Sequence, residues 1–228
     1  MPALSERLSV IAEKVKPGRS VCDVGTDHGY LPAYLYLEGR QTLVTATDIR
    51  EKPLINAKTN LKKLGAEGVN LILCDGLTGV SRNAADTVII AGMGGEVIMK
   101  IIKSCAFFPD KDIDLILQPM TASHKLRKFL FESGYEISDE TPVKEKGKIY
   151  SVMSVKYDGI KRTFDNFSLL VGKLNAKTPL GREYIEKQVR IYKKRVGLLE
   201  GSGEIEKLGA DKTVLCKLIK MLEEPYGA

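Results

Sequence analysis

The chain has 228 residues, 43% of them hydrophobic and 28% charged, and a net charge of +6, as expected for a soluble globular protein with one or two domains. No apolar run reaches the roughly 20 residues that span a bilayer, and the N-terminus lacks the apolar core of a signal peptide. Four scattered cysteines without a CxxC pair, and two histidines far from them, predict reduced thiols, no metal site and a cytoplasmic location.

Short apolar strands alternate with helices through the first two thirds of the chain. After an amphipathic helix within the first fifteen residues, the pattern predicts strands at 20–25, 43–48, 69–75, 86–92 and 112–119. The intervening helices are predicted at 31–38, 53–64, 96–103 and 122–133. Residues 135–157 form two further strands around a turn at Gly147. We therefore expect an α/β fold, a parallel sheet covered on both faces, with a final hairpin typical, by analogy, of the Rossmann-like class I methyltransferase sheet.

Strand signals stop after Gly159, and two helices follow. Apolar residues recur every three or four positions in two segments, at Ile185, Val189, Tyr192, Val196 and Leu199, and then at Ile205, Leu208, Leu215, Ile219 and Leu222. With Gly201-Ser202-Gly203 as the turn, this predicts antiparallel helices on a heptad seam. We expect a catalytic domain at 1–158 and a small coiled-coil-like domain at 159–228. The seam could also pair two chains, although we favour a monomer.

The most informative segment, DVGTDHGYLP, begins at Asp23, where the first strand meets the next helix. Gly25 and Gly29 permit positive φ and close approach of the backbone to a ligand. The segment lacks the GxGxxG of a dinucleotide fold and has Asp27 in the loop, which would repel a pyrophosphate. An acidic loop suits a ligand with a cationic end, such as the ammonium and sulfonium of S-adenosylmethionine.

Acidic residues also end the next two strands. Asp48, followed by Ile49, comes 23 residues after Gly25, where a carboxylate can accept hydrogen bonds from both hydroxyls of a ribose. Asp75, followed by Gly76, can accept one from the adenine amino group. A single Asp at a strand end is more often a helix cap or a turn residue. Three in consecutive units favour a nucleoside site.

The fourth predicted strand leads into a loop rich in glycine. In methyltransferases of this fold, that loop lies beside the transferable methyl group. We expect Ala91, Gly92 and Met93 to contact the cofactor, and Gly94 and Gly95 to admit a flat substrate. A tight turn before a helix explains the glycines about equally well.

These motifs resemble those of the bacterial TrmK family. The resemblance covers essentially the whole chain and rests on DVGTDHGYLP, TDIR, CDGL, IIAGMGGE, LILQPM and the C-terminal helical pair. TDHGYLP and GMGG are its most specific parts. The family methylates nitrogen N1 of the adenine at position 22 of tRNA. The resemblance therefore implies S-adenosylmethionine as cofactor, tRNA as partner, and a Rossmann-like catalytic domain followed by a coiled-coil-like domain.

The implied reaction needs no general base. N1 of neutral adenine carries a lone pair, and the methylated ring is positively charged, so the enzyme has to align the reactants and supply negative potential. A paired adenine must first leave its helix. Asp27 is the first candidate for a catalytic carboxylate, His28 the second, and Tyr30 an expected cofactor contact. Asp27 could equally bind the methionine ammonium, and His28 could simply bond to backbone.

The positive charge of the chain is concentrated in one segment. Residues 161–195 carry a net charge of +7, so the rest of the chain carries −1. On the first C-terminal helix this predicts contacts to tRNA phosphates from Lys187, Arg190, Lys193, Lys194 and Arg195. A solvated flank of a coiled coil is the alternative.

Three other functions compete with tRNA (adenine-N1) methylation. The nearest is a methyltransferase acting on another RNA position or on a non-RNA substrate. A nucleotide-dependent oxidoreductase is disfavoured by the missing GxGxxG and by Asp27. A non-catalytic RNA-binding module would leave the acidic strand ends without a task.

Overall fold

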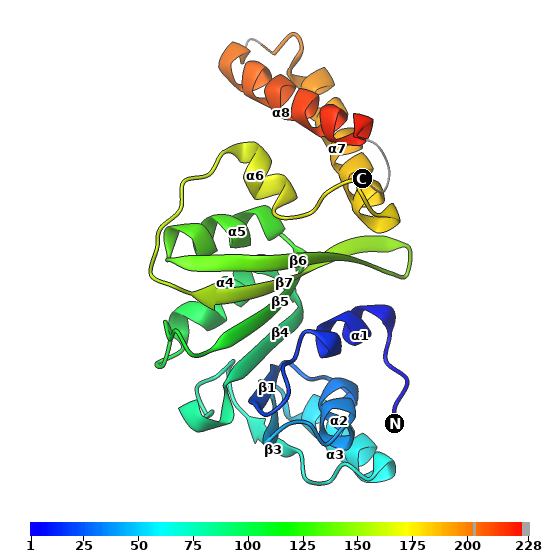
Figure 1. The fold of residues 1–228 in the computed structure, drawn as a ribbon, viewed down its shortest axis with the longest axis vertical. Helices are drawn as coiled ribbons and strands as arrows, with labels where there is room; N and C mark the ends of the chain where they lie inside the picture. The colour runs from blue at the N-terminus through cyan, green and yellow to red at the C-terminus, as the bar shows by residue number, and fades with distance from the viewer. Residues whose placement is uncertain (203, 225–228) are drawn as a thin grey trace.

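The computed structural model describes residues 1–202 and 204–224, so Gly203 of the predicted turn lies outside the described residues. Its centre is a seven-stranded sheet with strand order β3-β2-β1-β4-β5-β7-β6 (Figure 1). The strands are β1 Ser20–Val24, β2 Leu43–Asp48, β3 Asn70–Leu73, β4 Thr87–Gly94, β5 Asp114–Thr121, β6 Tyr135–Glu145 and β7 Lys148–Tyr157. The first five strands are parallel, whereas β7 runs antiparallel to β5 and β6. The predicted Rossmann-like methyltransferase sheet with its terminal hairpin is confirmed.

Helices connect and extend these strands. They are α1 Glu6–Glu13, α2 Tyr30–Leu37, α3 Glu51–Leu64, η1 Arg82–Ala84, α4 Gly95–Ser104, α5 Ser123–Glu132, α6 Asn166–Val171, α7 Pro179–Leu199 and α8 Ile205–Glu223. The sequence analysis did not predict η1 or α6, because three and six residues are too few to show a helical period. The signal for α6 is its capping box, in which Asp165 and Ser168 bond to each other's backbone amides.

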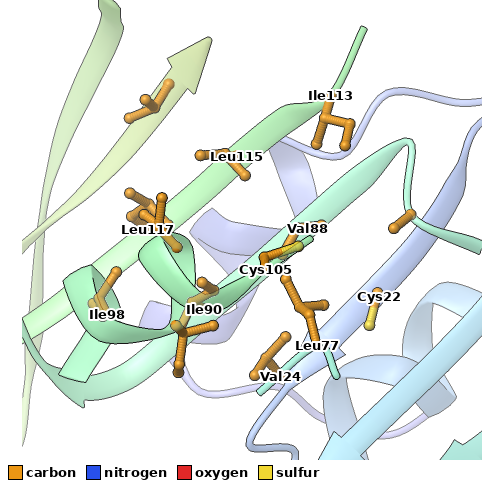
Figure 2. Close-up of a cluster of buried hydrophobic side chains, with 14 of the residues drawn as sticks. Cys22, Val24, Leu77, Val88, Ile90, Ile98, Cys105, Ile113, Leu115 and Leu117 are labelled. Carbon is orange, nitrogen blue, oxygen red and sulfur yellow. The ribbon is translucent and has the colours of Figure 1, made fainter. Parts of the chain in front are cut away.

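Two apolar layers hold the helices against the sheet. Val21 and Ile89 face the layer formed with α1, α2 and α3. Cys22 and Ile90, one residue further along the same strands, face the layer formed with α4 and α5, part of which is drawn in Figure 2. Because side chains alternate between the two covered faces, the central strands are continuous apolar runs. This explains why they were visible in the sequence.

The strand register brings the predicted motifs to one edge of the sheet. Val24 at the end of β1 lies beside Thr47 of β2 and Ile90 of β4. Asp48 lies beside Leu73 of β3. The strand order reverses between β1 and β4, and open α/β sheets bind their ligands at the carboxyl edge beside such a switch point.

The seam between α7 and α8 confirms only half of the predicted register. Ile185, Val189, Tyr192 and Val196 of α7 are buried in it. In α8, however, Ile205 is 81% exposed and Ile219 is 37% exposed, and Val214 and Leu218 are buried instead. Leu215 and Leu222 pack against the seam as predicted, so the prediction was wrong at Ile205 and Ile219. The seam also contains a buried carboxylate, Asp211, which pairs with Arg195. A polar residue on the seam conceals the true apolar period.

A buried ion pair joins the C-terminal helices to the sheet. Arg127 of α5 and Glu140 of β6 are both fully buried and bonded to each other. Arg127 Nη1 also donates to the carbonyl oxygens of Leu169 (2.7 Å) and Leu170 (2.9 Å) at the end of α6. The hydroxyl of Tyr184 on α7 donates to Leu170 O at 3.3 Å. One polar cluster therefore connects α5, β6, α6 and α7.

Candidate active site

A cavity of about 470 Å³ opens at the carboxyl edge of the sheet, where β1 to β4 end. Nine of the twelve predicted cofactor-binding residues line it: Gly25, Asp27, Asp48, Ile49, Asp75, Gly76, Ala91, Gly92 and Met93. Its volume is within the range of small-molecule sites. Four segments that are far apart in the sequence thus converge on one space.

The remaining predicted residues of this region lie around the cavity and do not line it. Asp23 is buried within β1, and burial, reinforced by the charge of Asp48, raises the pKa of Asp23 to about 6. A Cβ atom on Gly29 would lie 3.0 Å from Cβ of Ala57, so this glycine serves packing against α3. Tyr30 is 43% exposed at the start of α2.

The loop after β1 presents its backbone to the cavity. Gly25 has φ +78°, which favours glycine, and a Cβ atom there would lie 2.2 Å from Cε of Met93 and force the end of that side chain to move. The amides of Gly25 and Thr26 donate to the carbonyl of Thr47 at 2.8 and 3.0 Å, which fastens the loop to β2. Asp27 has φ +50°, a conformation uncommon for residues other than glycine and concentrated at functional sites.

Asp48 is buried, and one of its two carboxylate oxygens has no hydrogen-bond donor in the described part of the chain. It is 6% exposed, and its Oδ1 accepts a hydrogen bond of 2.9 Å from the amide of Arg50. Within the described part of the chain, Oδ2 has no hydrogen-bond donor. Since Asp48 lines the cavity, this oxygen is accessible there and can accept a hydrogen bond from the hydroxyl of a ligand.

Asp27 and His28 form a half-exposed pair at the mouth of the site. His28 Nε2 lies 3.4 Å from Asp27 Oδ2, and the two side chains are 55% and 62% exposed. Only Asp27 lines the cavity. The backbone carbonyl of His28 accepts a hydrogen bond from Asn60 of α3. His28 therefore does not line the cavity itself and contacts it only indirectly, through its interaction with Asp27.

A buried glutamine, which the sequence analysis overlooked as a site residue, supports the glycine-rich loop. Gln118 on β5 is fully buried, and its Oε1 accepts hydrogen bonds from Gly92 N (3.1 Å) and from Arg7 Nη1 (3.0 Å). Arg7 in turn pairs with Glu145 at 2.8 Å. The sequence signal for this role was Gln118 itself, a polar residue within the apolar strand segment LILQ. The substrate candidates Gly94 and Gly95 stand just beyond this support, outside the cavity lining.

One wall of the cavity comes from α4, which the sequence analysis did not include. It is formed by Val97, Lys100, Ile101 and Ser104. These positions have the i, i+3, i+4, i+7 spacing of a single helix face. The sequence signal for this wall is that α4 directly follows a ligand-binding loop, and the spacing of these four residues identifies the helix face that lines the cavity.

The five basic residues predicted on α7 are not equivalent. Lys187 Nζ donates to the carbonyl of Ile149 at 3.2 Å. Arg195 pairs with Asp211 at 3.0 Å. The other three are exposed and, among the described residues, have no ion-pair partner: Arg190, Lys193 and Lys194.

Within residues 1–202 and 204–224, no helix is both long and apolar enough to cross a membrane. In the same residues, no group of three or more His, Cys, Asp or Glu side chains is placed to hold a metal ion. All four cysteines are free thiols, with Cys22 and Cys105 buried and Cys216 exposed.

Comparisons with known proteins agree with this geometry. Residues 4–153 match the family described as "Methyltransferase domain". The tRNA (adenine(22)-N(1))-methyltransferase of Bacillus subtilis is 33% identical over 172 residues, which are 75% of this chain and 72% of that protein. The crystal structure of the B. subtilis m1A22 tRNA methyltransferase TrmK has a TM-score of 0.78 at 28% identity, covering 97% of this chain and 96% of that one.

A second solved structure carries the cofactor. It is Streptococcus pneumoniae Sp1610, a putative tRNA (m1A22) methyltransferase in complex with S-adenosyl-L-methionine, with a TM-score of 0.75 and 28% identity. The alignment covers 93% of this chain and all of that one. The chain therefore belongs to the TrmK-like family of tRNA (adenine(22)-N(1))-methyltransferases.

Proposed function

We propose that this protein transfers a methyl group from S-adenosylmethionine to N1 of adenine 22 in tRNA. The observation that carries the proposal is the cavity at the carboxyl edge, which has acidic residues at the ends of β2 and β3 and a glycine-backed loop after β1. The relative from B. subtilis is named for this reaction. Methylation of another RNA position is the nearest alternative.

The residues present fit the cofactor. The unpaired oxygen of Asp48 suits a ribose hydroxyl, and Asp75 suits the adenine amino group. Gly25 lines the cavity at positive φ with its backbone covered on the Cβ side by the Met93 side chain, so any larger residue would displace Met93, which lines the same cavity. Asp27, two residues after Gly25, also lines the cavity and places negative charge there. We assign Asp27 to the cationic part of the donor.

The chain's own groups have to position the acceptor and favour positive charge on it. When bound, S-adenosylmethionine supplies a sulfonium methyl group that the N1 lone pair can accept while sulfur keeps the electron pair of the broken bond. The adenine ring gains the positive charge that sulfur loses, so no proton is moved. Asp27, with His28 beside it, puts a carboxylate at this edge, and preorganised charge of this kind stabilises the transition state.

We propose that residues 1–158 carry out catalysis and that residues 159–228 contact the tRNA, as expected from the sequence. Arg190, Lys193 and Lys194 are exposed on α7 and can meet phosphates. The α7–α8 seam is filled within one chain, which supports a monomer. A tRNA substrate also supports the expected cytoplasmic location.

The first test is to incubate the protein with unmodified tRNA and methyl-labelled S-adenosylmethionine and to identify the labelled nucleoside. We expect 1-methyladenosine at position 22. Label in another nucleoside would overturn the assigned position, and no label in RNA would overturn the tRNA substrate.

The second test separates the two roles of Asp27. If Asp27 acts on the reacting groups, Asp27→Ala lowers kcat by at least about tenfold, while the Kd of S-adenosylhomocysteine changes much less. The control is Asp112→Ala, an exposed Asp just before β5 at the opposite edge of the sheet. Equal losses of ligand affinity and of activity would limit Asp27 to binding the donor.

A further inference from the structure

A second cavity, of about 350 Å³, is lined by residues of α5, α6 and α7, three helices whose positions above the sheet are seen in Figure 1. Its polar and aromatic wall is formed by His124, Asn166, Gln188, Tyr192 and Arg195. Leucines of α6 supply an apolar floor. Its location between the catalytic sheet and the C-terminal helices is outside the cofactor site.

The cavity contains polar groups that lack partners. Gln188 is only 7% exposed, yet its side-chain amide has no hydrogen bond within residues 1–202 and 204–224. The side chains of His124 and Asn166 are exposed and likewise have no hydrogen bond among the described residues. The amide of Gln188 is accessible from the cavity, where a ligand can reach it. An amide that lines an open space without a partner indicates a ligand that supplies donors and acceptors.

An aromatic and cationic platform faces the same space. The guanidinium carbon of Arg195 lies 4.6 Å from the ring centroid of Tyr192. Arg195 is held there by Asp211, whose Oδ1 accepts a hydrogen bond of 3.0 Å. Planar Tyr and Arg side chains, combined with amides, are what proteins use to stack an unpaired base of RNA and read its edge.

The cavity is close to the substrate side of the active site. Gly94 pairs with Thr121 at the end of β5, and a Cβ atom on Gly95 would lie 2.7 Å from the carbonyl oxygen of Ala122. His124 follows Thr121 by three residues, so their Cα atoms are at most about 11 Å apart. Burial and the nearby positive charges of Lys125, Arg127 and Arg195 lower the pKa of His124, so its imidazole is neutral more readily than usual.

We propose that this cavity binds an unpaired nucleotide of the tRNA close to the target adenine. The base lies on the guanidinium of Arg195, which is itself stacked on the buried ring of Tyr192, and its edge bonds to Gln188 and Asn166. The inference rests on the proposed function, because the ligand is part of the same RNA. It would give the enzyme a base-specific contact besides the target itself, and base contacts, unlike phosphate contacts, carry sequence information.

The test compares Gln188→Leu and Asn166→Ala with the wild type. Leucine keeps most of the buried volume of Gln188 but removes its amide, and Asn166 is exposed, so its replacement spares the core. Asn83→Ala is the matched control, because Asn83 is exposed on η1, away from both cavities. The measurements are the Kd of unmodified tRNA, kcat and KM for tRNA, and thermal stabilisation by S-adenosylhomocysteine.

We expect the Kd and KM of tRNA to rise roughly tenfold in each variant, with kcat at saturating tRNA and the cofactor stabilisation close to wild type. A photo-crosslinking amino acid at Ile191, which also lines the cavity, should label a nucleotide near adenine 22. Affinities equal to that of Asn83→Ala, or a crosslink to a distant part of the tRNA, would overturn the proposal. Label at another position in the wild-type nucleoside assay would instead overturn the proposed function, and the affinities would still decide the cavity.

Discussion

The buried Arg127–Glu140 pair allows a stability prediction that can be worked out in detail. Changing Glu140 to Gln keeps the shape of the side chain and removes its charge. Both side chains are fully buried, so the change leaves a guanidinium without its counterion in the interior. Breaking a buried ion pair from one side costs about 3–5 kcal/mol. For a chain of this length, 1 kcal/mol corresponds to roughly 2–4 °C in Tm, so we expect Tm to fall by about 6–20 °C.

The control for this prediction is an exposed pair of the same kind on the same helix. Lys128 and Glu132 are 3.8 Å apart and more than half exposed. Pairs of this kind contribute about 0–1 kcal/mol, so Glu132→Gln should hardly change Tm. Thermal unfolding followed by circular dichroism measures both variants. If Glu140→Gln lowers Tm no more than Glu132→Gln does, the reasoning about burial is wrong.

A double variant tests where the cost comes from. In Arg127→Met with Glu140→Leu no charge is left unpaired, so Tm should recover part of the loss seen for Glu140→Gln. Recovery should be incomplete, because the carbonyl of Leu169 loses its Arg127 donor, the carbonyl of Leu170 keeps only Tyr184, and the amide of Lys173 loses its acceptor. A double variant less stable than Glu140→Gln would contradict this account.

Three further predictions concern the cofactor cavity, the buried Asp23 beside it and the basic residues of α7. Gly25→Ala should weaken S-adenosylhomocysteine binding at least tenfold by calorimetry, because its Cβ atom meets Met93, whereas Gly39→Ala, also at positive φ but in open space, should not. The folded state raises the pKa of Asp23 from 3.8 to about 6. The stability contributed by its protonation is therefore present below about pH 4 and lost as pH rises through 6. The Tm advantage of Asp23→Asn should grow between pH 5 and 7.5, and parallel curves of Tm against pH for the two proteins would contradict this. Neutralising three exposed cations of α7, Arg190, Lys193 and Lys194, should reduce the slope of log Kd for tRNA against log salt concentration by about 2–3. The same change to three exposed cations of α3, Lys58, Lys62 and Lys63, should leave the slope unchanged.

The sequence was most informative where one residue type has one physical reason to be present. A strand covered on both faces must be apolar throughout, so the end of β2 at Asp48 could be located directly, whereas Asp75 follows the partly exposed edge strand β3 by two residues. The loop glycine Gly25 was identifiable because positive φ favours glycine. The topology brought these positions together as expected. The acidic and glycine-rich part of the cofactor cavity was therefore predictable.

The rest depended on pairings that a single sequence does not reveal. Asp211 resembles a surface residue until Arg195 is found opposite it, and the seam that contains this pair differs from the predicted one in α8. Gln118 is a buried amide whose partners, Arg7 and Gly92, are 111 and 26 residues away along the chain. The wall contributed by α4 required knowing which face of an apolar helix turns toward the ligand. In each case the missing information was a long-range contact.

The buried pair also bears on how one adenine is selected. Exposed cations on α7 attract any RNA, because phosphates are the same in every sequence. Selection requires contacts to bases at a fixed distance from the methyl donor. The cavity between α5, α6 and α7 keeps such a distance only if these helices stay fixed to the sheet, and Arg127 bonds to Glu140 of β6 and to the end of α6. A Glu140→Gln protein that remains folded should therefore lose discrimination between tRNA and unrelated RNA more than it loses cofactor affinity. Equal loss of both would assign the pair to stability alone.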